Sequence, residues 1–259
     1  TLITAFANLF GLGGAPLCAM ARGKGNREGA QGIMVNAGFM LLLSGAVLTV
    51  LGIVFHRPLL YLFGASEVTY PYASSYIVIY LIGTLCVMLS LGLNPYINCQ
   101  GFARTGMLTV ALGAAANIVL DPIFIFALHL GVRGAAIATV LSQFLSAAWV
   151  VKFLTGKKAE LKLDFRGFRP DRQCIQRITV LGIASFVMSF TDTLVQVACN
   201  ATLRNFGGDL YISVMTVLNS VRQIAQTPVL AIADGASTAI SYNYGARLYR
   251  RTRDAIRFM

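Results

Sequence analysis

Long apolar runs alternate with short polar connections along most of the chain, and this pattern predicts membrane-spanning helices. Seven runs are long enough, at about 1.5 Å per residue, to cross a hydrocarbon layer about 30 Å thick. They are Thr1 to Ala21, Met34 to Phe55, Tyr72 to Leu93, Thr105 to Leu128, Gly134 to Val151, Ile178 to Leu203 and Leu210 to Tyr242. We therefore expect an all-α integral membrane protein whose first partner is the lipid bilayer.

The composition supports this interpretation. Apolar residues make up 56% of the chain, charged residues only 12%, and the mean hydropathy is +0.69. Ordinary soluble domains carry about 25% charged residues and scatter them along the chain. Here the charges gather in the connections between the apolar runs, which excludes an ordinary soluble domain.

The basic residues indicate how the chain is threaded. Of the 21 Lys and Arg residues, 17 lie in or beside alternate connections, three lie in the connections between those, and Arg222 lies inside a run. Such a bias marks the basic connections as cytoplasmic. It also explains the net charge of +11 without a nucleic-acid partner. We expect a multi-pass protein of the bacterial inner (plasma) membrane.

One basic connection is too polar to enter lipid and divides the chain. We predict an N-terminal lobe at 1–154, a cytoplasmic linker at 155–176 and the start of a second lobe at 177–259. The sequence after Gly14 (GAPLCAMARGKGNREGA) resembles the sequence after Gly235 (GASTAISYNYGARLYRRTRDA), in the same orientation. Parallel repeats of this kind recur in secondary transporters. The two copies begin 221 positions apart, at Gly14 and Gly235. A repeat unit of about 220 residues predicts two six-helix lobes. This chain would carry the second to the eighth of the twelve helices.

Asp121 is the most informative polar residue, because a carboxylate in hydrocarbon costs at least about 2.5–3.5 kcal/mol and persists mostly where it faces an interior cavity. Asn117 lies one turn earlier on the same helix face. Thr139, on the next run, is expected at the same depth. These oxygen atoms can bind a hard cation such as Na⁺, and the carboxyl can instead hold a proton. The alternative is that Asp121 only hydrogen-bonds neighbouring helices.

A second candidate site lies in the later runs. Asp192 and Arg222 are expected at matched depth, either as a buried ion pair or as a proton or substrate site. Further amide side chains could line a polar chamber or bond between helices; they are Asn200, Asn219 and Gln226. Asp234 is expected near the cytoplasmic third of its run, where a vestibule or the interface tolerates it.

Motifs of soluble enzymes are absent from the sequence: it contains no GxxxxGK[ST], HExxH or GxSxG. We expect no enzyme activity, no cofactor, and no metal beyond a coupling Na⁺ at Asp121. Since no nucleotide-binding loop is present, an ion gradient is the expected source of energy. The five cysteines show no paired spacing and are interpreted as apolar packing residues.

Four stretches resemble the multidrug and toxic compound extrusion (MATE) family. They are NIVLDPIFIFALHLGVRGAAIATVLSQ (Asn117 to Gln143), RPLLYLFGAS (Arg57 to Ser66), GNREGA (Gly25 to Ala30) and SYNYGAR (Ser241 to Arg247). The resemblance implies a twelve-helix, two-lobe exporter of cationic, amphipathic compounds in exchange for Na⁺ or H⁺. It also implies a cation site that includes Asn117, Asp121 and Thr139, with a further Asp from a helix that this chain lacks.

The expected function is therefore multidrug efflux by alternating access, with organic cations as substrates and a monomer as the working unit. Two other functions fit parts of the sequence. A lipid-linked saccharide flippase of related architecture would be expected to have a basic cavity, whereas Arg222 is the sole basic residue inside a run. A non-transporting polytopic receptor would not be expected to show the repeat.

Overall fold

The computed structural model describes residues 2–63, 65 and 67–258. Thr1, at the start of the first predicted span, and Gly64 and Ser66, in the family-like stretch 57–66, lie outside the described residues. Within them the chain is helical and contains no strand. The elements are α1 (Leu2–Gly23), α2 (Arg27–Val54), α3 (His56–Leu62), α4 (Tyr70–Ile82), α5 (Thr84–Cys99), α6 (Ala103–Pro122), the π-helical turn η1 (Ile123–Ala127), α7 (Gly131–Thr155), α8 (Arg172–Gly245) and α9 (Tyr249–Phe258).

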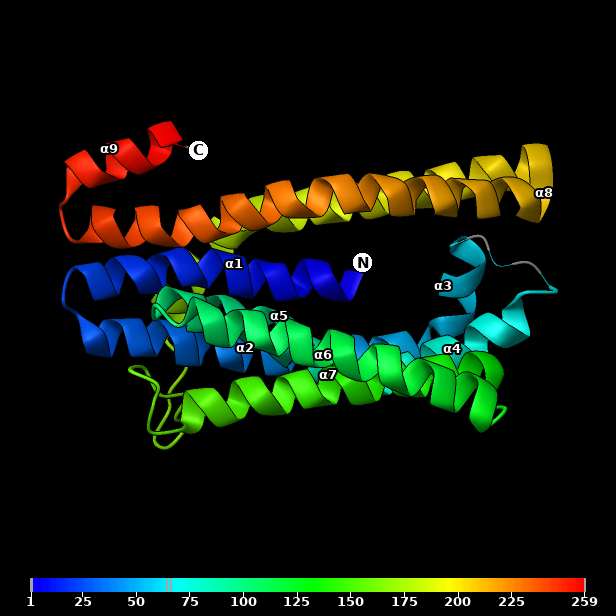
Figure 1. Ribbon diagram of the computed structural model, residues 1–259, viewed down its shortest axis with the longest axis horizontal. Coiled ribbons are helices and arrows are strands. Elements are labelled where there is room, and N and C mark those ends of the chain that lie inside the picture. Colours follow the sequence, from blue (N-terminus) through cyan, green and yellow to red (C-terminus); the bar gives the residue numbers. More distant parts are fainter. Residues whose placement is uncertain (1, 64, 66, 259) are drawn as a thin grey trace.

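The helices form an elongated bundle (Figure 1). By length and apolarity, five of the described helical segments can each cross a membrane, and α4 with α5 forms a sixth. The third predicted span was expected to be continuous, but it is two helices bent by 57° where Gly83 separates them. A continuous apolar run cannot reveal such a bend, because the residues before and after the bend are equally apolar.

The longest helix, α8, is a hairpin of two antiparallel halves. The chain reverses at Gly208, where φ is 62°, a value that glycine adopts without steric cost. Figure 1 shows the return half running along the whole bundle. Polar residues such as Asn219 and Arg222 lower its hydropathy below that of the other spans. The return half runs along the bundle beside these five or six candidate spans, and the all-α membrane architecture is confirmed.

The core is built around α1, which packs against α8, α5 and α2. Its fully buried side chains include Met34 from α2, Tyr96 from α5 and Leu154 from α7. Outside this core, large apolar side chains are exposed on the bundle, for example Ile118 at 71% and Ile224 at 75%. Apolar surface of this extent is expected where helices face lipid.

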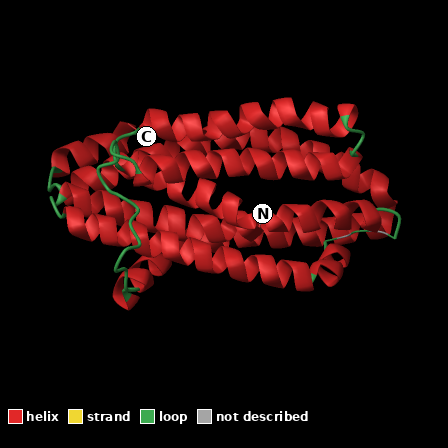
Figure 2. Cartoon of the chain, turned by 90° about the horizontal axis from the view of Figure 1, so that it is seen from below, coloured by secondary structure: helices red, strands yellow, loops and turns green. Residues whose placement is uncertain are grey.

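One end of the bundle carries the basic connections, and we call it the cytoplasmic end because the charge bias predicts that orientation. The turn between α1 and α2, the long loop 156–171 and the start of α9 all lie there (Figures 1 and 2). The loop is attached to the first lobe, because the backbone N–H of Leu161 donates to Gln100 and that of Asp171 donates to Asn36.

The two lobes touch at this cytoplasmic end through glycines. A side chain at Gly23 of α1 would collide with the carbonyl oxygen of Tyr242 of α8, and one at Gly245 would collide with the carbonyl oxygen of Met20. Small residues allow helix backbones to approach this closely in membranes. The end of α1 and the end of α8 are therefore in direct backbone contact.

Candidate functional site

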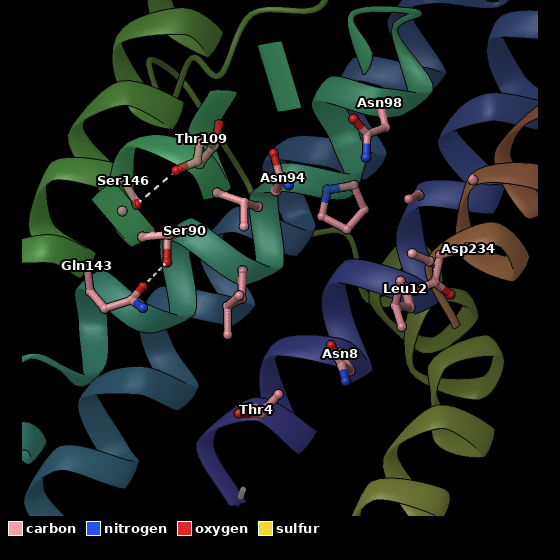
Figure 3. A pocket seen from close by; sticks show the side chains of 18 of the residues that line it. Thr4, Asn8, Leu12, Ser90, Asn94, Asn98, Thr109, Gln143, Ser146 and Asp234 are labelled. Carbon is pink, nitrogen blue, oxygen red and sulfur yellow. Dashed lines mark hydrogen bonds between the residues drawn. The ribbon is translucent and has the colours of Figure 1, made fainter. Parts of the chain in front are cut away.

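A cavity of about 750 Å³ lies between the two lobes. Its walls come from α1, α5, α6 and α7 of the first lobe and from α8 (Figure 3). Residues far apart in the sequence thus share one space: Asn8, Asn94, Asn117 and Asp234 all line it. A volume of this size can hold a drug-sized molecule.

Neutral polar groups dominate the polar part of this cavity. Amides come from the three asparagines named above and from Asn98 and Gln143, and hydroxyls come from side chains such as Thr4 and Ser142. Asp234 is the only charged residue among the lining residues, and none of them is basic. Leu12, Leu91 and Val110 add apolar surface. The wall is therefore amphipathic and contains a single carboxyl group among the described residues that line it.

Two prolines on facing helices add backbone acceptors to the wall. Pro16 interrupts α1 and Pro95 interrupts α5, and both line the cavity. Because proline has no N–H, the carbonyls of Leu12 and Leu91, four residues earlier, lose their helical donors. Both leucines are also lining residues. Each helix thus has, at a residue that lines the cavity, a carbonyl without its usual i+4 donor.

Side-chain hydrogen bonds fix the first-lobe part of the wall. The hydroxyl of Ser90 on α5 donates to Oε1 of Gln143 on α7 over 2.8 Å, and that of Ser146 donates to the carbonyl of Thr109 on α6 over 3.1 Å (Figure 3). These bonds join α5, α6 and α7 within the cavity wall. The orientation of Gln143 is therefore set before any ligand binds.

A second cavity, of about 680 Å³, adjoins the first towards the cytoplasmic end. Asn94, Asn98, Val110, Gly235 and Thr238 line both cavities. The second one ends at Arg22 and Tyr242, beside the glycine contact between the lobes. The two cavities together extend between α1, α5, α6 and α8 towards the cytoplasmic end, where Arg22 and Tyr242 line the second one.

The structure brings two of the three first-lobe candidates into contact. Nδ2 of Asn117 donates to Oδ1 of Asp121 over 3.3 Å, and both side chains are half-buried. Asn117 and Thr139 line the cavity. Asp121, one turn after Asn117 on α6, is not among the lining residues. The Thr139 hydroxyl donates to the carbonyl of Ala135 over 2.9 Å. Directly after Asp121 the helix widens into the π-helical turn η1, a distortion often found at functional sites.

Within the part of the chain that the structure describes, the second-lobe candidates share no hydrogen bond or ion pair and line neither cavity. Among the described residues the one salt bridge joins Arg22 and Glu160, so Asp192 and Arg222 do not form the expected ion pair. Both are exposed on α8. Neither lines either cavity, and the same holds for the three amide residues of this group, Asn200, Asn219 and Gln226. Residues at the same depth in the membrane need not meet. Depth does not fix the rotation of a helix about its axis, and this rotation decides which way each side chain points.

Two relationships escaped the sequence analysis. Asp234 was expected beside a vestibule or the interface, and its place as the acidic residue in the wall of this cavity was not predicted. Its position beside Gly235, in the repeat that matches the end of α1, was a usable signal. Cys18 and Cys99 were interpreted as separate packing residues, yet their Sγ atoms lie 3.3 Å apart between α1 and α5. No sequence signal predicts that contact.

Helices of the predicted first and second lobes meet around an amphipathic cavity in a chain with several membrane-span candidates, an arrangement typical of polytopic membrane transporters. Residues 1–123 match the family model MatE. The multidrug export protein MepA of Staphylococcus haemolyticus (strain JCSC1435) is 26% identical over 94% of this chain. The structure of the MATE multidrug transporter DinF-BH superposes over 99% of the chain with a TM-score of 0.94 and 29% identity. The chain is thus similar to MATE transporters over nearly its whole length, and its first 123 residues match the family model.

The comparisons also show how much of a relative this chain represents. It spans 54% of the S. haemolyticus MepA and 58% of DinF-BH. A MOP superfamily transporter from Pyrococcus furiosus, 27% identical, is covered to 56% with a TM-score of 0.84. The relatives are transporters and not enzymes. The five or six segments that can cross a membrane make this chain a multi-pass membrane protein.

Proposed function

We propose that the protein to which this chain belongs is a secondary active transporter that exports cationic, amphipathic small molecules in exchange for Na⁺ or H⁺. The observation that carries the proposal is the charge of the cavity: one acidic residue, Asp234, and no basic residue among its lining side chains. A single negative charge in an otherwise neutral, partly apolar wall favours a monovalent organic cation with an apolar body.

The coupling ion is proposed to bind at Asp121. Its carboxylate already accepts a hydrogen bond from Asn117, and Asn117 reaches the cavity wall. Carboxylate and amide oxygens are suitable ligands for Na⁺, and a carboxyl surrounded by helices can equally take up H⁺. An ion at Asp121 would pull on Asn117, so ion binding and ligand binding would act on the same part of the wall.

Alternating access links the two events. A ligand shifts the balance between two states only through its different affinity for them. If the coupling ion favours one arrangement of the lobes and the exported cation favours the other, the ion gradient drives export. The cavity is built from both lobes of one chain, so we propose that a monomer suffices.

A saccharide flippase is less well supported. Anionic lipid-linked substrates would need basic side chains in the cavity. The basic residue at the end of the second cavity is Arg22, and its guanidinium already forms a salt bridge with Glu160.

The test is efflux of a fluorescent cationic dye from cells that express the full-length protein, with the Na⁺ gradient and the pH gradient varied independently. We expect efflux to require one of the two gradients, and to be weaker for a neutral dye of the same shape. Efflux that survives the collapse of both gradients would refute ion exchange.

A further inference from the structure

Arg22 joins three parts of the molecule at the cytoplasmic end. It lies in the last turn of α1, directly before Gly23, and its side chain is 16% exposed. One guanidinium nitrogen donates to the carbonyl of Cys99 on α5, and another forms the salt bridge with the Glu160 carboxylate. The guanidinium carbon lies 5.7 Å from the centre of the Tyr242 ring on α8, within the range of a cation–π contact.

The loop between the lobes is fastened so that Glu160 faces this arginine. Nε and a terminal nitrogen of Arg27 donate to the backbone carbonyl of Glu160, over 3.1 and 2.5 Å. The neighbouring Leu161 is fully buried, and its N–H donates to Gln100 over 2.9 Å. The backbone of Glu160 is therefore held by first-lobe residues, and its carboxylate forms the salt bridge that orients Arg22.

These contacts differ in which parts they connect. Cys99 and Glu160 hold Arg22 from the first-lobe side, whereas Tyr242 belongs to the second lobe. Opening of the cytoplasmic end must separate Gly23 from the end of α8, and hence break the contact between Arg22 and Tyr242. The contacts of Arg22 with Cys99 and Glu160 do not oppose that movement. They fix the guanidinium in the position from which it meets the ring.

We propose that Arg22 and Tyr242 form a clasp that closes the cytoplasmic end of the second cavity, and that Glu160 is the positioning residue that holds Arg22 ready for it. The inter-lobe loop thereby sets how strongly the closed state is favoured. The proposal rests on the proposed function only in assuming that the lobes separate at this end during transport. Its own content is a shift in the balance between two arrangements of the lobes.

The experiment measures that balance without transport. Thr238 lines both cavities, so Thr238→Cys in the full-length protein reports access to them. Its reaction with a membrane-impermeant maleimide is followed in inside-out vesicles for cytoplasmic access and in right-side-out vesicles for external access. The same protein without the introduced cysteine serves as the blank for the native cysteines.

We expect Glu160→Gln to raise the cytoplasmic labelling rate about two- to tenfold and to lower the external rate, the scale expected for losing one partly exposed charge contact. Tyr242→Leu should do the same, whereas Tyr242→Phe keeps the aromatic face and should label like the parent. Glu28→Gln is the matched control, because Glu28 is an exposed acid in the first turn of α2, near the same end.

Unchanged labelling in both Glu160→Gln and Tyr242→Leu would overturn the clasp, and so would equal effects of Tyr242→Leu and Tyr242→Phe. A merely structural role would raise labelling from both sides, which also counts against the proposal. Failure of the proposed function is separate: a protein that labels as expected but exports no cation retains the clasp and loses the export assignment.

Discussion

Gly23 and Gly245 occupy equivalent positions in the internal repeat and form the two halves of one reciprocal contact. The separation of Gly23 from Gly245 is 222 positions, and that of Met20 from Tyr242 is the same. Each glycine faces the carbonyl of the residue that lies three positions before the other glycine. Such mutual pairing is the property of a two-fold interface. The repeat therefore creates its own inter-lobe contact at the cytoplasmic end.

Gly23→Ala should destabilise the closed arrangement of the lobes. The added methyl group meets backbone atoms of α8, which cannot turn away as a side chain can. Overpacking of this kind costs about 1–3 kcal/mol. Thermal unfolding of the purified full-length protein should show a lowered Tm. Gly32→Ala is the control, since a methyl group there meets nothing within 4 Å; an equal Tm for both variants would contradict the contact.

Asp234→Asn should weaken the binding of a monovalent cationic dye. The substitution removes the one charge of the cavity wall and keeps its size. Hydrogen bonds to charged groups contribute about 1.5–3 kcal/mol, and partial exposure reduces this, so we expect roughly five- to thirtyfold weaker binding. Equilibrium fluorescence titration measures the change, and Asp234→Glu should restore most of the affinity. Asp254→Asn on α9, an acid outside both cavities, should bind like the parent.

Asp121→Asn should separate binding from coupling. The amide retains the size of the carboxylate and can still bond to Asn117, but it cannot ionise. We expect gradient-driven efflux to fall by about tenfold or more, in the range of typical coupling free energies, while dye binding and expression stay near the parent values. Undiminished efflux would refute the coupling role of Asp121. Equally weakened binding and efflux would instead assign the residue to the ligand site.

Tyr96→Phe should lower the free energy of unfolding and leave the cavity unchanged. Tyr96 is fully buried, and its hydroxyl donates to the carbonyl of Phe10 over 2.7 Å, which ties α5 to α1. Loss of such a bond costs about 0.5–1.5 kcal/mol. Denaturation of the full-length protein measures the change. Tyr72→Phe, at an exposed position on α4, should change stability by less than about 0.5 kcal/mol.

The sequence was most informative where a property is local along the chain. The apolar runs, the basic connections and the Asn117–Asp121 spacing each depend on neighbouring residues, and the helices and the hydrogen bond between those two side chains follow from them. The bend at Gly83 was missed because a hydropathy pattern carries no information on the direction of the helix axis.

Sites that combine distant helices were harder to predict. Depth in the membrane follows from counting residues, but it does not fix the rotation of a helix about its axis or its neighbours. Asp192 and Arg222 share a predicted depth and still do not pair, whereas Asp234 and Asn8 line one cavity without any shared pattern.

The sequence by itself determined a multi-pass helical protein and its resemblance to MATE transporters, and it predicted an orientation and a repeat, because hydropathy, charge and motifs depend on residues close together in the chain. The tertiary structure alone decided which charge faces the cavity, that the repeated glycines meet, and that Arg22 lies between Glu160 and Tyr242. These relationships depend on how helices rotate and pack against one another, and packing is settled by contacts between residues far apart in the sequence.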